Sequence, residues 1–209
     1  KSLDDSAAKA IKGVKAVLRV PTDRGGEGVA VIAEGYWPAK QGRDALKVEW
    51  DTSAVGKPDS TALLAQYREL ATKPGLVAMQ ADMAPLAGAA HKISAEFVFP
   101  YLAHAPMEPL NCTIQLDGDK AELWMGTQMP GLDAMAAAKT LGLPPQNIKV
   151  HTQMAGGGFG RRAIPSSDYV VEACGVAKAV RTAGISAPVR TLWSREDDIK
   201  GGYYRPMHV

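Results

Sequence analysis

The sequence has little of several things that would mark a specialised class of protein. Only two of its 209 residues are cysteine, aromatic residues make up 6%, and the formal net charge is +2. So small a charge predicts neither a nucleic-acid-binding protein nor one that binds a membrane surface by charge. Cys112 and Cys174 lie far apart and belong to no C-x-x-C motif, so they form one disulfide at most or stay as two buried thiols. Periplasm and cytoplasm therefore both remain open as the compartment.

Long apolar runs are also absent. No stretch approaches the length of a membrane span, and no signal peptide is visible. Apolar residues make up 46% and charged residues 22%, which is ordinary for a globular protein. The chain begins at Lys1 without a methionine and ends in Tyr203–Val209, which resembles the start of a strand. We therefore expect a piece excised from a longer protein.

The common nucleotide-binding and nucleophile motifs are missing. A phosphate-binding P-loop needs Gly-Lys-Ser/Thr where this chain has Arg161-Arg162-Ala163, and a dinucleotide fingerprint needs a glycine where Arg161 stands. No serine or cysteine lies in a nucleophile elbow. A nucleotide kinase and a nicotinamide-dependent enzyme are therefore poor interpretations.

Histidines and carboxylates form no cluster with metal-ligand spacing. His104 and Glu108 stand four residues apart, but Pro106 and Pro109 make that segment extended or irregular instead of helical. We interpret His104 as a hydrogen-bonded structural group in a buried turn, and Asp197-Asp198 as a solvated helix end. A metal held by side chains is not predicted.

The pattern of elements that is present indicates an α+β protein. Residues 1–52 read as helix, strand, strand, helix and strand, which is typical of a compact α+β unit. Within them Gly28–Ala33 is a continuous apolar stretch, predicted to be a strand buried on both faces. Residues 53–88 form a connector with one amphipathic helix, Thr61–Ala71, capped by Asp59-Ser60.

Residues 89–209 combine further strands and helices. His91–Phe99 alternates with period two and is predicted to be a strand. Asp117-Gly118-Asp119-Lys120 lies between two apolar runs and predicts a hairpin. The remaining elements are predicted as a helix over Leu132–Leu141, a strand over Asn147–Gln153, a helix over Val170–Val180 and a strand over Val189–Trp193.

The most informative stretch is the glycine-rich loop after the strand over Asn147–Gln153. It reads Gly156-Gly157-Gly158-Phe159-Gly160 and continues with Arg161-Arg162. Glycines let backbone N–H groups approach a ligand, successive N–H groups make an anion-binding concavity, and arginine adds a forked donor. Phe159 is expected to pack over a flat group or close a cavity. The alternative is a tight strand-to-helix turn with two solvated arginines.

Three motifs, in their order and separation, carry a resemblance to a known family. They are Ala103-His104-Ala105-Pro106-Met107-Glu108-Pro109, Trp124-Met125-Gly126-Thr127-Gln128-Met129-Pro130 and Gly156-Gly157-Gly158-Phe159-Gly160-Arg161-Arg162. The set resembles the molybdopterin-binding large subunit of the xanthine dehydrogenase/aldehyde oxidase family, nearest the isoquinoline 1-oxidoreductase β-subunit type. Gly28–Trp50 resembles the end of the α/β hammerhead domain that precedes the cofactor domains. The resemblance covers nearly the whole chain.

The resemblance implies a domain order and an activity. Residues 1–52 would end the hammerhead domain, 53–88 would be a connector with one helix, and 89–209 would begin the molybdopterin-binding α+β domain. The whole subunit would be a molybdenum hydroxylase that hydroxylates an N-heteroaromatic ring carbon or oxidises an aldehyde with oxygen from water. Its cofactor would be molybdopterin cytosine dinucleotide with molybdenum, and electrons would leave through an iron–sulfur subunit.

The resemblance also implies roles for single residues. Gln128 would hydrogen-bond an oxo ligand of the metal, and Gly158 and Phe159 would lie beside the metal centre, with Phe159 also bordering the substrate cavity. Gln128 and Phe159 are thus the expected catalytic residues. The cofactor-binding residues would be Gly126, Thr127, Gln128, Gly156, Gly157, Gly158, Phe159, Gly160 and Arg161. Arg161 and Arg162 depart from the Gly-Gly-Lys ending seen elsewhere in the family, so their roles stay open.

The catalytic glutamate of the family lies in a Gly-Glu motif far toward the C-terminus, outside these residues. We therefore expect the isolated chain to be inactive and to lack the cofactor. The alternative, from a different class, is a non-catalytic binding or scaffold module that keeps the fold and has lost the cofactor.

Overall fold

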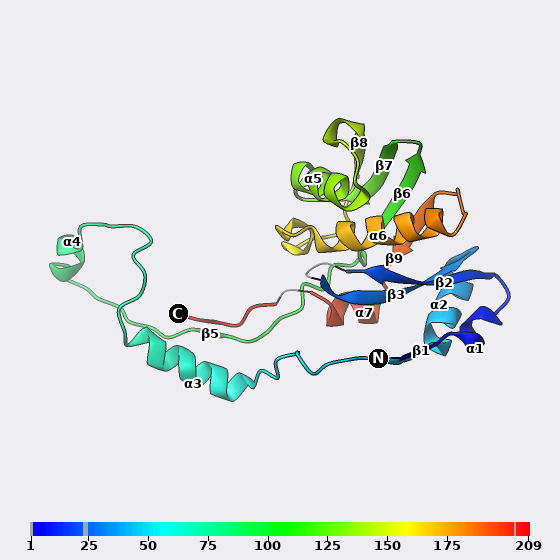
Figure 1. The fold of residues 1–209 in the computed structure, drawn as a ribbon. Helices are drawn as coiled ribbons and strands as arrows, with labels where there is room; N and C mark the ends of the chain where they lie inside the picture. The colour runs from blue at the N-terminus through cyan, green and yellow to red at the C-terminus, as the bar shows by residue number, and fades with distance from the viewer. Residues whose placement is uncertain (1, 23–24, 203) are drawn as a thin grey trace. The chain divides into compact units, whose positions relative to one another are not determined.

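The computed structural model describes residues 2–22, 25–202 and 204–209, and the chain forms two compact units (Figure 1). One unit comprises Lys1–Asp51 and Ala103–Tyr203, and the other comprises Thr52–Leu102 and Tyr204–Val209. Helices and strands are mixed along the chain, so the predicted α+β class is confirmed.

The N-terminal part of the first unit contains two antiparallel ribbons and two helices. Its elements are β1 (Ser2–Asp4), α1 (Ser6–Lys9), β2 (Val14–Pro21), β3 (Glu27–Ala33), α2 (Tyr36–Ala45) and β4 (Lys47–Glu49). β2 pairs with β3, and β1 pairs with β4. The predicted order of helix, strand, strand, helix and strand is confirmed, and the short β1 is an addition to it.

The second part of this unit is a four-stranded sheet with helices packed on one face. Its strands are β6 (Asn111–Asp117), β7 (Lys120–Gly126), β8 (Ile148–Gln153) and β9 (Val189–Leu192), in the order β8-β7-β6-β9. Its helices are α5 (Pro130–Leu141), α6 (Asp168–Thr182) and α7 (Arg195–Lys200), with short 3₁₀ turns η2 (Pro145–Asn147) and η3 (Arg161–Ala163). The predicted hairpin, both long helices and the strands at 147–153 and 189–193 are confirmed.

Strand direction brings three chain segments to one edge of this sheet. β7 and β8 are parallel and joined through α5, so both end at the same edge, where Gly126 pairs with Gln153. β6 runs antiparallel to β7 and therefore begins at that edge, with Asn111. The segments 103–110, 126–129 and 154–163 meet there, and together we call them the loop layer.

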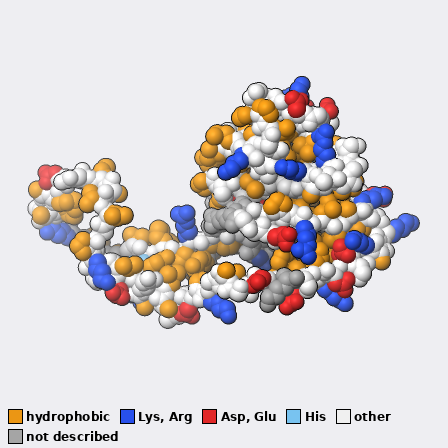
Figure 2. Space-filling view, in the orientation of Figure 1, with side chains coloured by type: hydrophobic (Ala, Val, Ile, Leu, Met, Phe, Trp, Pro, Cys, Tyr) orange, Lys and Arg blue, Asp and Glu red, His pale blue; other side chains and the backbone are white. Residues whose placement is uncertain are grey.

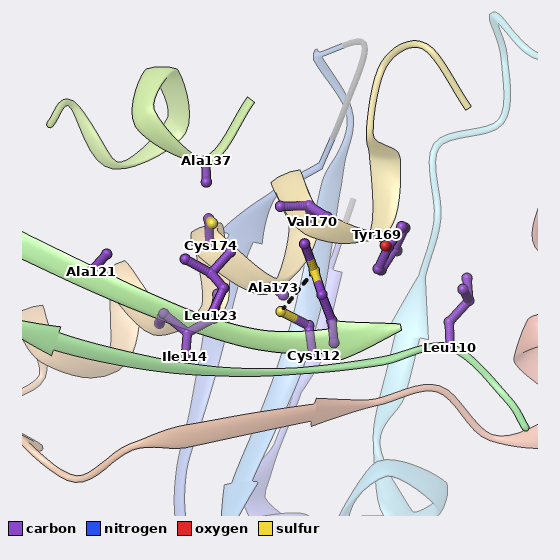
Figure 3. Packing of buried hydrophobic residues seen from close by; sticks show 12 residues of the cluster. Leu110, Cys112, Ile114, Ala121, Leu123, Ala137, Tyr169, Val170, Ala173 and Cys174 are labelled. Atoms are coloured by element: carbon purple, nitrogen blue, oxygen red, sulfur yellow. Dashed lines mark hydrogen bonds between the residues drawn. The ribbon is translucent and has the colours of Figure 1, made fainter. Parts of the chain in front are cut away.

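Helix α6 lies between the four-stranded sheet and the β2–β3 ribbon (Figure 1). It is buried on two sides, and its charged residues Lys178 and Arg181 lie on the part that stays exposed. Val176 and Val180 pack against Val20 of β2 on one side. On the other side the helix meets the apolar face of the sheet, where Figure 3 shows Ala173 and Cys174 among the buried side chains.

The apolar core of the sheet holds both cysteines as free thiols. Cys112 and Cys174 are buried, which decides between the two states that the sequence left open. The Cys112 Sγ lies 3.7 Å from the Met125 Sδ (Figure 3). Burial raises the pKa of the Cys112 thiol to about 12, so it stays protonated at neutral pH and is not a nucleophile.

The prediction that Gly28–Ala33 is a strand is confirmed, but the prediction that it is buried on both faces is wrong. All of these residues are only half-buried, because a two-stranded ribbon leaves its edges open. Ala30 and Ile32 pack toward α6. Val31 faces α2, where a Cβ added to Gly42 would lie 2.8 Å from the Val31 Cγ1.

The second unit has few elements. They are α3 (Ser60–Ala71), α4 (Ala84–Ala87), β5 (Val98–Phe99) and β10 (Met207–His208), with β5 and β10 antiparallel. The predicted cap of α3 is confirmed, because the Asp59 Oδ1 accepts the Ala62 N–H at 2.7 Å. Figure 2 shows many hydrophobic side chains on the surface of this unit, and Leu76, Val77 and Ile93 are among the most exposed.

The prediction of a strand over His91–Phe99 is wrong except at its end. Only Val98 and Phe99 are in a strand, and the whole stretch is exposed. Alternation of apolar and polar residues gives a strand only where a partner strand and a covered face are available, and here the pairing partner is the two-residue β10. The predicted domain limits after residues 52 and 88 concern the intact subunit and stay a prediction.

In the part of the chain that the structure describes, no helix is both long enough and apolar enough to cross a membrane.

Candidate functional site

The glycine-rich loop has a backbone that only a few residue types adopt easily. Gly157 and Gly160 have φ of 109° and 92°, and Phe159 between them has φ of 53°. A non-glycine residue in the left-handed region is uncommon and strained, and such residues cluster at functional sites. Phe159 is 75% exposed, so packing of its ring does not hold this conformation. The loop closes with the Arg161 N–H donating to the Gly158 carbonyl at 2.9 Å.

The first glycines of the loop are packed against the other two segments of the loop layer. A Cβ on Gly156 would lie 2.6 Å from the Glu108 Cβ, and one on Gly158 would lie 2.7 Å from the Gln128 Oε1. A Cβ on Gly157 would lie 2.9 Å from the Pro106 Cβ. The missing side chains therefore let protein segments approach each other, and these three glycines can present only their backbone to a ligand.

The middle of the loop offers a run of hydrogen-bond donors. Among the described residues, none is recorded as accepting a hydrogen bond from the N–H groups of Gly157, Gly158, Phe159 and Gly160. Successive backbone N–H groups of this kind form an anion-binding concavity. Anion binding by this loop stays a prediction, and the backbone supplies the donors that it needs.

Gln128 lies directly beside this run of donors. Its backbone N–H donates to the Arg162 carbonyl at 3.2 Å, and its Oε1 accepts the Arg162 N–H at 3.2 Å. Because the Oε1 is used in this way, the Nε2 is the part of the amide that remains for another partner, and no acceptor for it is recorded within the described residues. The structure thus brings together Gln128 and Gly158, which the sequence had placed in one site.

Gly126 and Thr127 face the protein and hold the start of the Gln128 loop. The Tyr169 hydroxyl donates to the Gly126 carbonyl at 3.1 Å. The Thr127 hydroxyl donates to the Asp133 carboxylate and accepts the Met129 N–H at 3.0 Å. Burial, with the Asp133 charge beside it, raises the pKa of Tyr169, so the phenol stays a donor. Sequence reasoning missed Asp133 and Tyr169, which carry no motif of their own.

The alternative that the sequence left open, a turn with two solvated arginines, is wrong for both arginines. Arg161 is 4% exposed and makes a bidentate pair with Asp168, at 2.9 and 2.8 Å. The side chain of Arg162 is 0% exposed, and its Nη2 lies 3.0 Å from the Glu108 Oε2. Both guanidinium forks are directed at protein carboxylates and not at the open side of the loop. Arg161, predicted to bind cofactor, therefore faces Asp168 in this structure.

Glu108 joins the first segment of the loop layer to the glycine loop. Its Oε2 accepts the Gly156 N–H at 2.8 Å, and its Oε1 accepts from the Asn111 amide at 2.8 Å. Burial acts to raise the pKa of Glu108, but the Gly156 N–H, the Asn111 amide and the Arg162 charge outweigh it, so the pKa lies below the ordinary value. Glu108 is thus a carboxylate at neutral pH.

His104 lies in the same segment, outside any helix, and is half-buried. The prediction that the prolines prevent a helix between His104 and Glu108 is confirmed. Within the described residues, no group of three or more His, Cys, Asp or Glu side chains could hold a metal ion.

The interpretation of Asp197-Asp198 as a solvated helix end is wrong for Asp198. Asp198 is buried, although its neighbour is not, because α7 turns it toward positive groups at the same edge of the sheet. Burial raises the pKa of Asp198, and Arg161, Arg195, Arg162 and His104 oppose that rise by their charge. Adjacent side chains of a helix point in different directions, so the sequence could have indicated that only one of the two carboxylates faces water.

Each segment of the loop layer also carries a large exposed apolar side chain. These side chains are Met107, Met129, Met154 and Phe159. Apolar side chains around a few polar donors are typical of small-molecule sites. Together with the free N–H groups and the Gln128 amide, they make this layer the candidate functional site.

Comparison with known proteins identifies the family of this chain. The family described as the molybdopterin cofactor-binding domain matches residues 71–208, which include all three segments of the loop layer. The isoquinoline 1-oxidoreductase subunit beta of Brevundimonas diminuta is 32% identical over 217 residues, covering 97% of this chain and 26% of that protein. A membrane-bound aldehyde dehydrogenase [pyrroloquinoline-quinone] of Gluconacetobacter polyoxogenes is 30% identical over 215 residues, covering 100% of this chain and 27% of that protein.

A solved structure shows the same fold. The quinoline 2-oxidoreductase of Pseudomonas putida 86 superposes with a TM-score of 0.61 and 20% identity, covering 97% of this chain and 30% of that one. The chain thus spans about a quarter of the length of the curated relatives that it matches. Because the family match covers well over half of its residues, this chain belongs to the molybdopterin cofactor-binding domain family.

Proposed function

We infer that this chain is the part of a molybdenum hydroxylase large subunit that holds the molybdopterin cofactor next to the reacting centre. The observation that carries the proposal is the run of free N–H groups from Gly157 to Gly160 beside the Gln128 amide. The family match supplies the identity of the ligand class.

The residues of the loop layer fit an anionic group with a flat apolar part. Consecutive N–H donors suit phosphate or other anionic oxygens, and the Glu108 carboxylate, which contacts the loop, is occupied by Gly156, Asn111 and Arg162. The methionines and Phe159 provide the apolar rim. The absence of a metal-ligand cluster among the described residues suits a metal that the pterin would carry.

Each predicted site residue has a proposed task. Gln128 donates from its Nε2 to the cofactor, and the Gly157–Gly160 backbone binds its anionic groups, while Gly156 gives its N–H to Glu108. Phe159 forms a wall of the substrate cavity and excludes water. Gly126, Thr127 and Arg161 hold the loops in place through their contacts with the protein. When bound, the molybdenum cofactor supplies oxidation chemistry with oxygen taken from water.

For the intact protein, the proposal also names the substrate, the form of the cofactor and the partner subunit. The substrate is an N-heteroaromatic ring or an aldehyde, the cofactor is the cytosine dinucleotide form, and an iron–sulfur subunit accepts the electrons. Residues 1–52 would end a hammerhead domain, 53–88 would connect it, and 89–209 would begin the cofactor domain. The catalytic base comes from outside these residues, so the isolated chain turns over no substrate.

The test uses the full-length subunit, produced with its partners in a host that makes the molybdenum cofactor. Molybdenum and pterin are measured per subunit, and kcat is normalised to molybdenum. Gln128→Ala should lower kcat by roughly two to three orders of magnitude, the effect of removing a donor that is aimed at developing charge. Gln115→Ala, an exposed glutamine on β6 away from the loop layer, is the matched control and should leave kcat unchanged.

Two outcomes would overturn the proposal. A wild-type subunit without molybdenum and pterin would support the non-catalytic scaffold module, and the same extraction would reveal pyrroloquinoline quinone if the chain shared the cofactor for which its Gluconacetobacter relative is named. If the Gln128→Ala variant keeps more than about half of the wild-type kcat, Gln128 does not donate to the reacting centre.

A further inference from the structure

The buried Arg162 side chain makes contact with all three segments of the loop layer. Its Nη1 donates to the Gly126 carbonyl at 3.1 Å, and its Nε donates to the Gly157 carbonyl at 3.1 Å. Its Nη2 donates to the Glu108 carbonyl at 3.2 Å and to the Glu108 Oε2 at 3.0 Å. One guanidinium therefore joins segments that are up to 54 residues apart in sequence.

The backbone of the same residue fixes Gln128. The Arg162 carbonyl accepts the Gln128 N–H, and the Arg162 N–H donates to the Gln128 Oε1. This two-point contact sets both the position of the loop and the orientation of the amide. Any shift of Arg162 would therefore turn the Nε2 donor as well.

Glu108 closes the network from the other side. Its carboxylate binds the Gly156 N–H and the Arg162 guanidinium, and its own N–H donates to the Gly156 carbonyl at 3.1 Å. The carboxylate is thus the counter-charge of a fully buried cation. Breaking such a pair by removing one charge leaves the other buried without compensation, which is strongly unfavourable.

We propose that Glu108 and Arg162 are positioning residues that lock the loop layer together and fix Gln128 against the glycine loop. This positioning role deepens the proposed function and rests on it, because the proposed function names the reaction in which Gln128 takes part. The packing itself is independent of that function. Glu108 binds the Gly156 N–H and Arg162 binds the Gly157 carbonyl and Gln128, so they act through Gln128 and the backbone of the glycine loop.

The loop contains a matched control for this pair. Arg161 and Asp168 form a second buried ion pair, which joins the end of the glycine loop to the first residue of α6. Removing the charge of Asp168 therefore breaks a similar buried pair but keeps every contact that Glu108 and Arg162 make between the three segments. A purely structural role for Glu108 would give the two variants similar consequences.

The experiment compares Glu108→Gln with Asp168→Asn in the full-length subunit with its partners. Both substitutions keep the shape of the side chain and remove its charge. Amide hydrogen exchange is followed by mass spectrometry in peptides that cover 103–112, 124–131, 154–160 and 161–172. We expect Glu108→Gln to speed exchange in the first three peptides at once, and Asp168→Asn to speed it only in 161–172.

Kinetics give the second readout. Glu108→Gln should lower kcat per molybdenum by roughly 10- to 100-fold, the effect of misplacing a catalytic group by about 1 Å, with a much smaller change in KM. Asp168→Asn should lower kcat less. Arg162→Lys keeps the charge and loses the fork, so it should retain molybdenum but show the same exchange pattern as Glu108→Gln in a weaker form. This variant also serves if Glu108→Gln does not fold.

The outcomes separate this proposal from the proposed function. If Glu108→Gln and Arg162→Lys speed exchange only in their own peptides, or if Asp168→Asn gives the same pattern and the same loss of kcat, the positioning role is wrong. If the wild-type subunit contains no molybdenum, the proposed function fails, while the exchange patterns still decide whether the pair locks the loop layer.

Discussion

The apolar core of the four-stranded sheet and the loop layer at its edge are stabilised by different forces. The core is a contiguous set of buried aliphatic and aromatic side chains between the sheet and α5 and α6. The three segments of the loop layer are joined to one another by close glycine contacts, buried ion pairs and hydrogen bonds to backbone carbonyls. Apolar burial is non-directional, whereas hydrogen-bonded ion pairs demand fixed geometry. The core therefore determines how stable the unit is, and the loop layer determines where Gln128 lies.

The largest expected effect on stability comes from the core. Leu123→Ala removes a fully buried side chain from β7 and should lower the free energy of unfolding by about 2–5 kcal/mol, through lost burial and a cavity. Urea unfolding measures the loss. Because the core does not set the position of Gln128, the variant molecules that remain folded should bind cofactor as the wild type does. A fall in molybdenum per folded subunit would contradict this separation of core and loop layer.

Gly156→Ala should destabilise the protein less than Leu123→Ala does, but it should disturb the site more. The new Cβ would lie 2.6 Å from the Glu108 Cβ, so the two segments must separate. Overpacking of this kind typically costs about 1–3 kcal/mol. We expect most of the bound molybdenum to be lost at temperatures where the protein remains folded by circular dichroism. Gly131→Ala is the control, because a Cβ there meets no atom within 4 Å. A similar loss of molybdenum in that variant would show that the contact between Gly156 and Glu108 is not what holds the site.

The smallest effect concerns pH. The pKa of Glu108 is lowered in the folded protein, so its contribution to stability is fully present above its ordinary value of 4.5 and is lost as the pH falls through the lower folded value. Wild type should lose more stability than Glu108→Gln as the pH falls below 4.5. Thermal unfolding of both proteins across that range measures the difference, and parallel curves would show that the Glu108 charge does not stabilise the loop layer.

Much of the fold and the position of the site could be predicted from the sequence. The hairpin turn at Asp117–Lys120, the αL glycine that ends α5 and the apolar run of β3 are local signals. The meeting of three motifs at one edge follows from strand direction, since parallel β7 and β8 end together and the antiparallel β6 begins there.

The contacts inside the loop layer could not be predicted in the same way. Arginine is mostly exposed in proteins, and a sequence gives no direct sign that Arg161 and Arg162 are buried. The partner of Arg161 is seven residues away, but the partner of Arg162 is 54 residues away and comes from another segment. The strand predicted over His91–Phe99 failed for the opposite reason, because its alternation is local while a strand needs a distant partner.

The position of α6 between two sheets has a consequence for how the chain folds. Val20, near the N-terminus, packs against Val176 and Val180, so this contact closes a loop that includes most of the chain. Contacts of such high sequence separation slow folding, because loop-closure entropy must be overcome before the contact stabilises anything. During synthesis β2 and β3 leave the ribosome long before α6 exists, and their apolar face toward α6 stays exposed until then. Newly made chains should therefore be most prone to aggregation, and most dependent on chaperones, in the interval before α6 emerges.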